Sequence, residues 1–251
     1  MIWRDIVSSY KQTVLGPLWL VIQALMGSAV FTIIFGNIAG LSTDGHPAFL
    51  FYLCGNLGWQ YFGKTFGIGC NALQSNLGIF SKVYFPRLIP PFTSSISALL
   101  DFAIQFAVLL LAILIYNYNY APPSTLPLYS ALFLPLLIFQ TILLGLGTGF
   151  IISSLSIKYR DIGRLGGLIS QFIMYASPVI YPLSEIPNKY QHFLVYNPLT
   201  FIIESYRHIL LGNSSGCTWE YATPSIMLTV IIFLLGTAFY NKTQKNFVDY
   251  A

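Results

Sequence analysis

Residues 58–65 fit, letter for letter, the G-x-x-x-x-G-K-[ST] pattern of a nucleotide phosphate-binding loop. Such a loop wraps backbone amides around phosphates at the point where a strand gives way to a helix. Here the motif contains three aromatic residues and lies inside a long apolar segment. No apolar strand ending in a magnesium-binding aspartate is evident among the eight acidic residues. The sequence therefore argues against nucleotide binding at this motif.

The sequence also gives little support for a metal site or for acid–base catalysis. Glu204 and His208 share a helix face, with His192 nearby, but no further ligand spacing indicates a metal site. A membrane-embedded enzyme acting on a lipid-linked sugar would need acidic residues gathered near one membrane face. The candidates are dispersed along the chain: Asp44, Glu185, Glu204 and Glu220. We predict no catalytic residue, no metal and no cofactor, so the chain is expected not to be an enzyme.

Two charged residues, Lys64 and Asp101, lie inside apolar segments. A charge in hydrocarbon costs roughly 2.5–3.5 kcal/mol on insertion scales, so intramembrane charges usually pair or face a cavity. Both residues lie about 15–18 Å from the turn that joins their segments, at a rise of about 1.5 Å per helical residue. Antiparallel neighbours would place them level. We predict an ion pair between them; the alternative is that each faces water or a carbonyl on its own.

The composition is that of a membrane protein. Only 8% of the 251 residues are charged and 55% are hydrophobic, whereas soluble domains carry about 25% charge. Six apolar segments have the length of about 20 residues that a helix needs to cross a bilayer. We expect one all-α integral membrane domain over residues 1–251, with spans at 17–38, 48–72, 91–116, 126–151, 165–182 and 221–240. An ion-coupled secondary transporter would want inverted repeats, and none is clear.

The basic residues indicate the topology. Nine of the twelve lie in four short stretches separated by even numbers of crossings. Because loops rich in Lys and Arg stay in the cytosol, both termini are expected there. The external connections carry only Lys189 and Arg207. Basic residues grouped at span ends do not form a continuous phosphate-tracking patch, so lipid headgroups or a cytosolic protein are expected partners, and nucleic acid is not.

Aromatic and small residues recur at helical spacing. Tyr52, Trp59, Phe62 and Phe66 fall on one helix face, where they could line a conduit for sugar rings or simply pack the core. Gly63 with Gly67, and Gly145 with Gly149, fit the small-xxx-small spacing that permits close helix contact.

Three segments are expected to lie at the membrane surfaces. Residues 1–16 alternate apolar and polar residues at helical spacing, which predicts an amphipathic interface helix. Residues 76–90 form a cytoplasmic loop too long for a plain turn. The external residues 183–212 contain capping signals and a second apolar run after Asn197, which predicts two short re-entrant helices.

These segments also carry a family resemblance. Arg4-Asp5-Ile6 followed by Tyr10-Lys11-Gln12-Thr13-x-Leu15-Gly16-Pro17-Leu18-Trp19 resembles the N-terminal signature of permease subunits of type-2 ABC exporters that move polysaccharides such as O-antigen or teichoic acid. Further similarity lies in order downstream, at residues 83–87, 158–162, 177–182 and 197–199. Ser9 is a departure, because the family commonly has a basic residue there.

The resemblance implies a half-transporter. Two copies would form the conduit in the inner membrane of a bacterium, a separate ATPase dimer would dock below, and a lipid-linked glycan would be the cargo. A permease for small drugs, with the same fold, is the alternative. The resemblance assigns ATPase coupling to Arg4, Asp5, Tyr10, Lys11, Lys82, Tyr84, Arg87, Arg160 and Asp161. It adds Trp19 and Tyr175 to the conduit candidates and assigns the external gate to Pro178, Tyr181, Asn197, Pro198 and Arg207.

Overall fold

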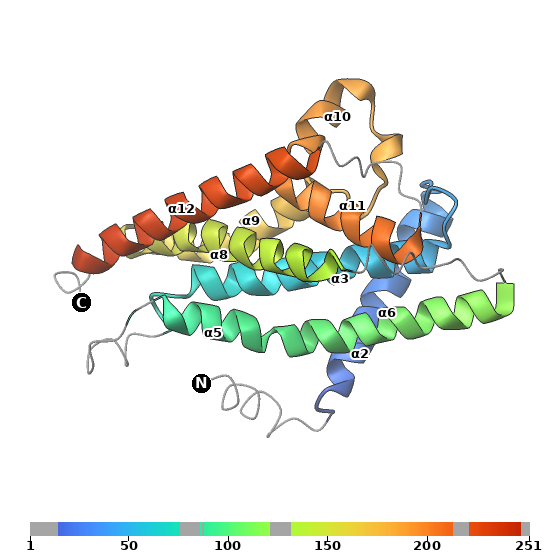
Figure 1. The fold of residues 1–251 in the computed structure, drawn as a ribbon, viewed down its shortest axis with the longest axis horizontal. Helices are drawn as coiled ribbons and strands as arrows, with labels where there is room; N and C mark the ends of the chain where they lie inside the picture. Colours follow the sequence, from blue (N-terminus) through green and yellow to red (C-terminus); the bar gives the residue numbers. More distant parts are fainter. Residues whose placement is uncertain (1–14, 76–85, 87, 121–131, 213–220, 247–251) are drawn as a thin grey trace.

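The computed structural model describes residues 15–75, 86, 88–120, 132–212 and 221–246, and every regular element in them is helical. The expected all-α class is thus confirmed for this part of the chain (Figure 1). The elements are α2 (Leu18–Phe31), η1 (Thr32–Ile38), α3 (Ala48–Cys70), α5 (Ile89–Ser97), α6 (Leu99–Tyr120), α8 (Leu134–Lys158), α9 (Arg160–Tyr175), η2 (Leu183–Glu185), α10 (Asn188–Val195), α11 (Pro198–Leu211) and α12 (Ala222–Asn246).

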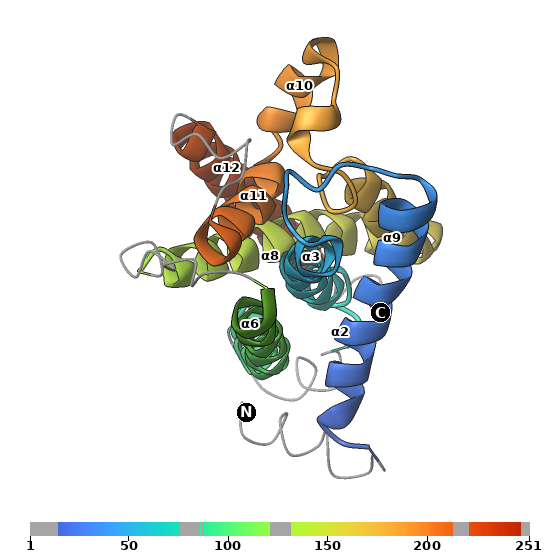
Figure 2. The same cartoon turned by 90° about the vertical axis from the view of Figure 1, so that its right-hand side faces the viewer.

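Helix α3 is the centre of the molecule. Most of its residues are buried, because α8, α11, α6 and α2 all pack against it. Figure 2 views α3 and α6 nearly end-on, whereas α2 is seen along its length and so crosses them at a steep angle. Helix α12 covers α8 on the far side from α3, and α10 projects away from the bundle (Figures 1 and 2). Helix α3 is therefore the common neighbour of α2, α6, α8 and α11.

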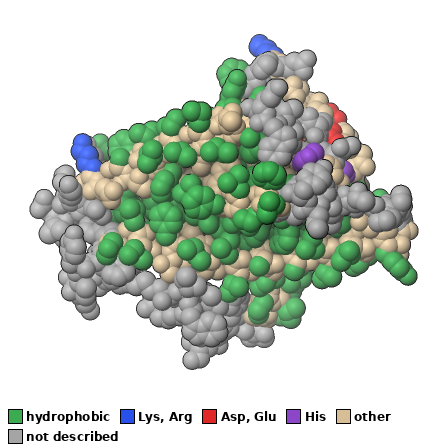
Figure 3. All heavy atoms as spheres, viewed as in Figure 1, with side chains coloured by type: hydrophobic (Ala, Val, Ile, Leu, Met, Phe, Trp, Pro, Cys, Tyr) green, Lys and Arg blue, Asp and Glu red, His purple; other side chains and the backbone are tan. Residues whose placement is uncertain are grey.

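Four helical segments in the described residues are long and apolar enough to cross a membrane: Leu18–Ile38, Ile89–Asn119, Leu134–Ile157 and Ala222–Thr243. Hydrophobic side chains cover much of the face in Figure 3, and Lys and Arg side chains appear there only at its margins. Lipid can solvate such a surface, because hydrocarbon needs no polar partner. Helix α3 is not among the four, since Asn56, Gln60 and Lys64 interrupt its apolar character.

The helices at two of the predicted spans have bounds that differ from the prediction. The span expected at 126–151 is a helix from Leu134 to Lys158, and residues 121–131 lie outside the described part of the chain. The span expected at 165–182 is α9, which ends at Tyr175. Pro178 explains that end, because proline has no N–H to continue the helix and disfavours helical backbone in the residue before it.

Glycines set the distance between α3, α8 and α12. A methyl group added to Gly149 would lie 2.6 Å from the Phe66 carbonyl oxygen and 2.7 Å from the Gly69 Cα. On the opposite side of α8, a methyl group on Gly236 of α12 would lie 2.2 Å from the Gly147 carbonyl oxygen. The predicted packing role of Gly149 is confirmed. A methyl group added to Gly63 or Gly67 would have no neighbour within 4 Å among the described residues. These two glycines therefore do not serve a close helix contact in the described part of the chain.

Replacing Gly149 with alanine should destabilise the fold. Its methyl group would meet backbone, which cannot rotate away, so α3 and α8 must separate at a cost of about 1–3 kcal/mol. Thermal unfolding of the detergent-solubilised protein measures this loss. Gly63→Ala is the matched control, because its methyl group meets nothing, and alanine favours a helix over glycine by up to about 1 kcal/mol. Equal losses in both variants would contradict the packing role of Gly149.

Candidate functional site

Helix α11 begins at a set of polar contacts with the turn that follows α9. Asn197 caps the helix by accepting a hydrogen bond from the Leu199 N–H at 3.1 Å, and Pro198 occupies the first helical position. The Asn197 amide also donates to the Ala176 carbonyl oxygen at 3.0 Å and to the Ser177 hydroxyl at 3.2 Å. Tyr181 closes the same turn by donating its hydroxyl to the Tyr175 carbonyl oxygen at 2.8 Å. The start of α11 is thereby fixed to the end of α9.

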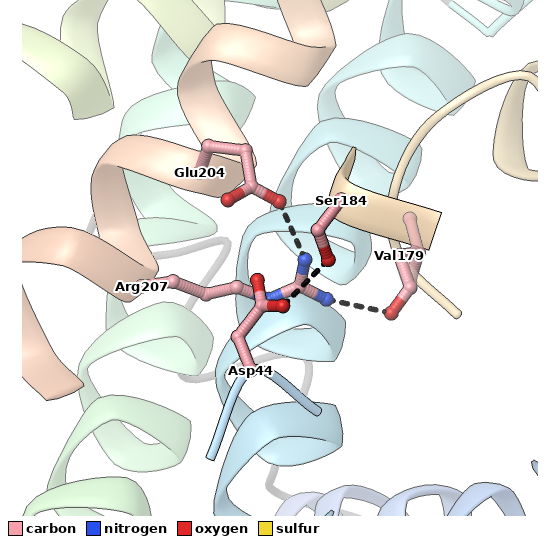
Figure 4. A network of polar contacts seen from close by, with 5 residues as sticks. All are labelled: Asp44, Val179, Ser184, Glu204 and Arg207. Carbon is pink, nitrogen blue, oxygen red and sulfur yellow. Dashed lines mark hydrogen bonds and ion pairs between the residues drawn. The ribbon is translucent and has the colours of Figure 1, made fainter. Parts of the chain in front are cut away.

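Arg207, two and a half turns further along α11, is 1% exposed and holds the same turn from the inside. Its guanidinium donates to the Val179 carbonyl oxygen at 2.8 Å and to the Glu204 carboxylate at 2.7 Å, and Glu204 is 2% exposed (Figure 4). The guanidinium carbon lies 3.7 Å from the centre of the Phe51 ring of α3, a cation–π contact. One side chain therefore joins α11, the turn after α9 and α3.

The space for this guanidinium comes from Gly55 of α3. A methyl group there would lie 2.6 Å from the Arg207 Nη2 atom. Beside the ion pair, Asp44 accepts a hydrogen bond from the Ser184 hydroxyl at 2.6 Å, joining the loop before α3 to η2 (Figure 4). A buried charge is stable only with paired and hydrogen-bonded neighbours, and this arrangement supplies them. We call Asp44, Val179, Ser184, Glu204 and Arg207 the arginine network.

A second polar group lies between α3 and α6. The Lys64 ammonium contacts the Asp101 carboxylate as an ion pair, as the sequence predicts. One turn away on both helices, the Gln105 amide donates to the Gln60 side-chain oxygen at 2.8 Å. The two contacts follow one antiparallel register, because a step of four residues along each helix returns to the same face. Four polar side chains thus form a continuous strip.

This strip lines one wall of a cavity of about 220 Å³ between α2, α3 and the junction of α5 with α6. Gln23 of α2 lies on the opposite wall, and the remaining lining is Leu20, Tyr61, Ala98 and Phe102. Lys64 is 47% exposed and Asp101 15% exposed, so the cavity opens to the surface of the single chain. Charged groups at membrane depth usually face a cavity or a partner, and this opening provides one.

The aromatic face of α3 is mostly a packing face. Tyr52, Phe62 and Phe66 are buried among other helices, which supports the packing alternative that the sequence leaves open for them. Trp59 is half-buried. Trp19 and Tyr175, the other conduit candidates, are exposed on α2 and α9. Of the six conduit candidates, Trp19 and Tyr175 are thus the two exposed ones.

The coupling residues cannot be compared with the structure in the same way. Most lie outside the described residues: Arg4, Asp5, Tyr10, Lys11, Lys82, Tyr84 and Arg87. Arg160 begins α9, and Asp161 is exposed in its first turn. In the part of the chain that is described, no three His, Cys, Asp or Glu side chains gather as metal ligands.

Comparison with known proteins decides the family. A model of the ABC-2 type transporter family matches residues 1–211. The chain belongs to that family. It is 24% identical over 246 residues to the O-antigen export system permease protein RfbA of Klebsiella pneumoniae, covering 98% of this chain and 91% of the relative. It is 24% identical to the polysialic acid transport protein KpsM of Escherichia coli, covering 96% and 91%.

A third relative is the capsule polysaccharide export inner-membrane protein CtrC of Neisseria meningitidis, 19% identical over 98% of this chain and 90% of the relative. An ABC-2 type transporter chain is a transport subunit, which confirms the prediction that this chain is not an enzyme. Permeases of such exporters work with an ATPase subunit. The arginine network and the polar cavity therefore belong to a transport subunit.

Replacing Arg207 with methionine should leave Glu204 buried without its cation, which costs about 3–5 kcal/mol. The expected result is a large fall in the thermal unfolding temperature of the purified protein. The double variant Arg207→Met/Glu204→Leu should recover much of the loss, because replacing both members of a buried pair with apolar residues is often neutral. Lys189→Met, at an exposed residue of α10, should change stability little. An Arg207→Met variant as stable as Lys189→Met would contradict the role of the network.

Proposed function

We propose that this chain is the membrane-spanning subunit of an ATP-driven exporter of a lipid-linked polysaccharide. The supporting observation is its match, along nearly the whole chain, to permeases named for O-antigen, polysialic acid and capsule export. Each alignment covers about 90% of the relative and at least 96% of this chain. The alternative, a permease for small molecules, has the same fold, and a fold alone does not determine the cargo. The two proposals therefore differ in the size of the molecule that is exported.

In the proposed arrangement two copies of the chain form the conduit, with six crossings each and both termini in the cytosol. Helices α3 and α9 join the four long apolar segments as the remaining spans. Although Lys64 and Asp101 lower the apolar character of this region, they are paired, which reduces the cost of placing them in hydrocarbon. Residues 183–212 then form the external re-entrant region, held to α3 by Arg207.

The separate ATPase dimer would dock on the cytoplasmic side, on residues 1–16 and 76–90. Most of each segment lies outside the described residues, and the proposal for them rests on their basic residues and on the family resemblance. Closure of the ATPase pair would push this loop and tilt the helices. Because α3 contacts α8, α11, α6 and α2, a displacement at its Cys70 end would reach the external region through the arginine network.

Deletion of the gene in its host tests the function. Surface polysaccharide should disappear, with glycan retained inside the cell, as measured by gel electrophoresis of surface extracts and by antibody labelling before and after permeabilisation. The wild-type gene should restore export, and Lys82→Glu/Arg87→Glu should not, because reversed charges repel an acidic docking surface. Lys242→Glu is the matched control, a basic residue expected on the same side but outside the docking segments.

Unchanged surface polysaccharide in the deletion strain, combined with greater sensitivity to small toxic compounds, would favour the efflux alternative and overturn the proposal. Full export by the Lys82→Glu/Arg87→Glu variant would instead reject the docking segment alone.

A further inference from the structure

The position of Lys64 along α3 gives the depth of the cavity between α2, α3 and α6. At a rise of about 1.5 Å per residue, Lys64 lies about 24 Å from the Ala48 end of α3 and about 9 Å from the Cys70 end. The cavity therefore opens in the half of the membrane that is expected to face the cytosol. Its opening exposes Gln23 and nearly half of the Lys64 side chain. Lipid tails offer these groups no hydrogen-bond partner. Transfer of an amide from water to an apolar medium without a hydrogen bond costs about 2–7 kcal/mol of free energy.

The chemistry of the lining residues limits the class of ligand that the cavity can bind. Three glutamine amides line it, at positions 23, 60 and 105, and each has two N–H donors and one acceptor oxygen. One donor of Gln105 and one lone pair of the Gln60 oxygen are used in the hydrogen bond between these two residues, and the other groups can meet a ligand. Lys64 and Asp101 carry the only formal charges among the lining residues, and they cancel as an ion pair. A phosphate or an acidic sugar would therefore meet no net positive charge. Uncharged hydroxyl groups, each both donor and acceptor, suit a wall of amides.

The rest of the lining is apolar. Leu20, Ala98 and Phe102 contribute it, and Tyr61 adds its ring while its hydroxyl donates to the Ser95 carbonyl oxygen at 3.3 Å. A sugar ring has the matching form, with hydroxyls around its edge and C–H groups on its faces. Small-molecule sites combine an apolar lining with a few placed polar groups in about 300–1,000 Å³. A cavity of about 220 Å³ is smaller, so it accommodates a single sugar ring rather than a repeat unit.

We propose that this cavity is a binding site for one uncharged sugar ring of the exported glycan, contacted by Gln23, Gln60 and Gln105 beside the Lys64–Asp101 pair. The proposal rests on the proposed polysaccharide export and adds the class of sugar and the place where it binds. The paired charges give the site selectivity, since a neutral wall disfavours acidic sugars that would need a free cation.

Binding of short oligosaccharides to the permease–ATPase complex in lipid nanodiscs tests the proposal. The probes are mannotriose, maltotriose and cellotriose, which are uncharged, a sialic acid trimer of similar length, and inorganic phosphate as a competitor. Saturation-transfer NMR detects such weak binding and gives dissociation constants by titration. At least one uncharged trisaccharide should bind more tightly than the sialic acid trimer, and phosphate should not displace it.

Gln23→Leu and Gln60→Leu should each weaken that binding about two- to tenfold, the range for a lost hydrogen bond. Gln23 is exposed, so its replacement should not disturb the fold. Gln140→Leu is the matched control: this buried amide donates to Ser225 at 2.8 Å and to Thr229 at 3.3 Å between α8 and α12, away from the cavity. It should leave oligosaccharide binding unchanged.

No binding by any uncharged trisaccharide would overturn the proposal, as would equal affinity in the Gln23→Leu/Gln60→Leu double variant. Displacement by phosphate would identify an anion site instead. An equal loss of binding in Gln140→Leu would show a general effect of helix packing and would also overturn it. The binding experiment and the gene deletion test the two proposals separately. Export of polysaccharide without oligosaccharide binding would reject the sugar site and keep the proposed function. Oligosaccharide binding without export would reject the proposed function and keep a sugar site in the cavity.

Discussion

A polar or charged side chain inside hydrocarbon must find its partner within the protein. In the described residues that constraint joins helices distant in sequence, and three contacts illustrate it. Arg207 joins α11 to α3 and to the turn after α9; Lys64 and Gln60 join α3 to α6; and Gln140 joins α8 to α12. Apolar packing between helices is non-directional, whereas each of these contacts selects one register.

The arginine network and the glycine contacts complement each other. Glycines let α8 approach α3 on one side and α12 on the other, which creates a closely packed three-helix layer. Arg207 then fixes α11 and the turn after α9 to the same helix, α3, in a space that Gly55 leaves open. A movement of α3 would therefore reach both the layer and α11. This is the property that a transporter needs if its motor is a separate protein acting from below.

The sequence predicts the contacts that depend on helical periodicity alone. Lys64 and Asp101 are level in antiparallel helices, and Gln60 with Gln105 follows from the same register, although the prediction stops at the charged pair. The i, i+3 spacing of Glu204 and Arg207 was equally readable as an ion pair, but Glu204 was weighed as a metal ligand or catalytic acid. The burial of the aromatic face of α3 could not be predicted from the sequence. Its periodicity places Tyr52, Phe62 and Phe66 on one face, but only the positions of α2, α8 and α11 decide that this face packs inward. The end of α9 at Tyr175 differs from these cases, because Pro178 is a local signal for it that the predicted span 165–182 did not use.

The central claim is that Gln23, an exposed polar residue of α2, faces a polar cavity and not lipid. A nitroxide spin label at Gln23→Cys, in a chain whose native cysteines are replaced, tests this directly in lipid nanodiscs. Relaxation by a water-soluble nickel chelate is compared with relaxation by oxygen, which concentrates in hydrocarbon. We expect relaxation by the nickel chelate to exceed relaxation by oxygen at position 23. The ratio should be much smaller at Leu25→Cys, which is two residues away and on the opposite face of α2. Oxygen-dominated relaxation at position 23, equal to that at position 25, would contradict it.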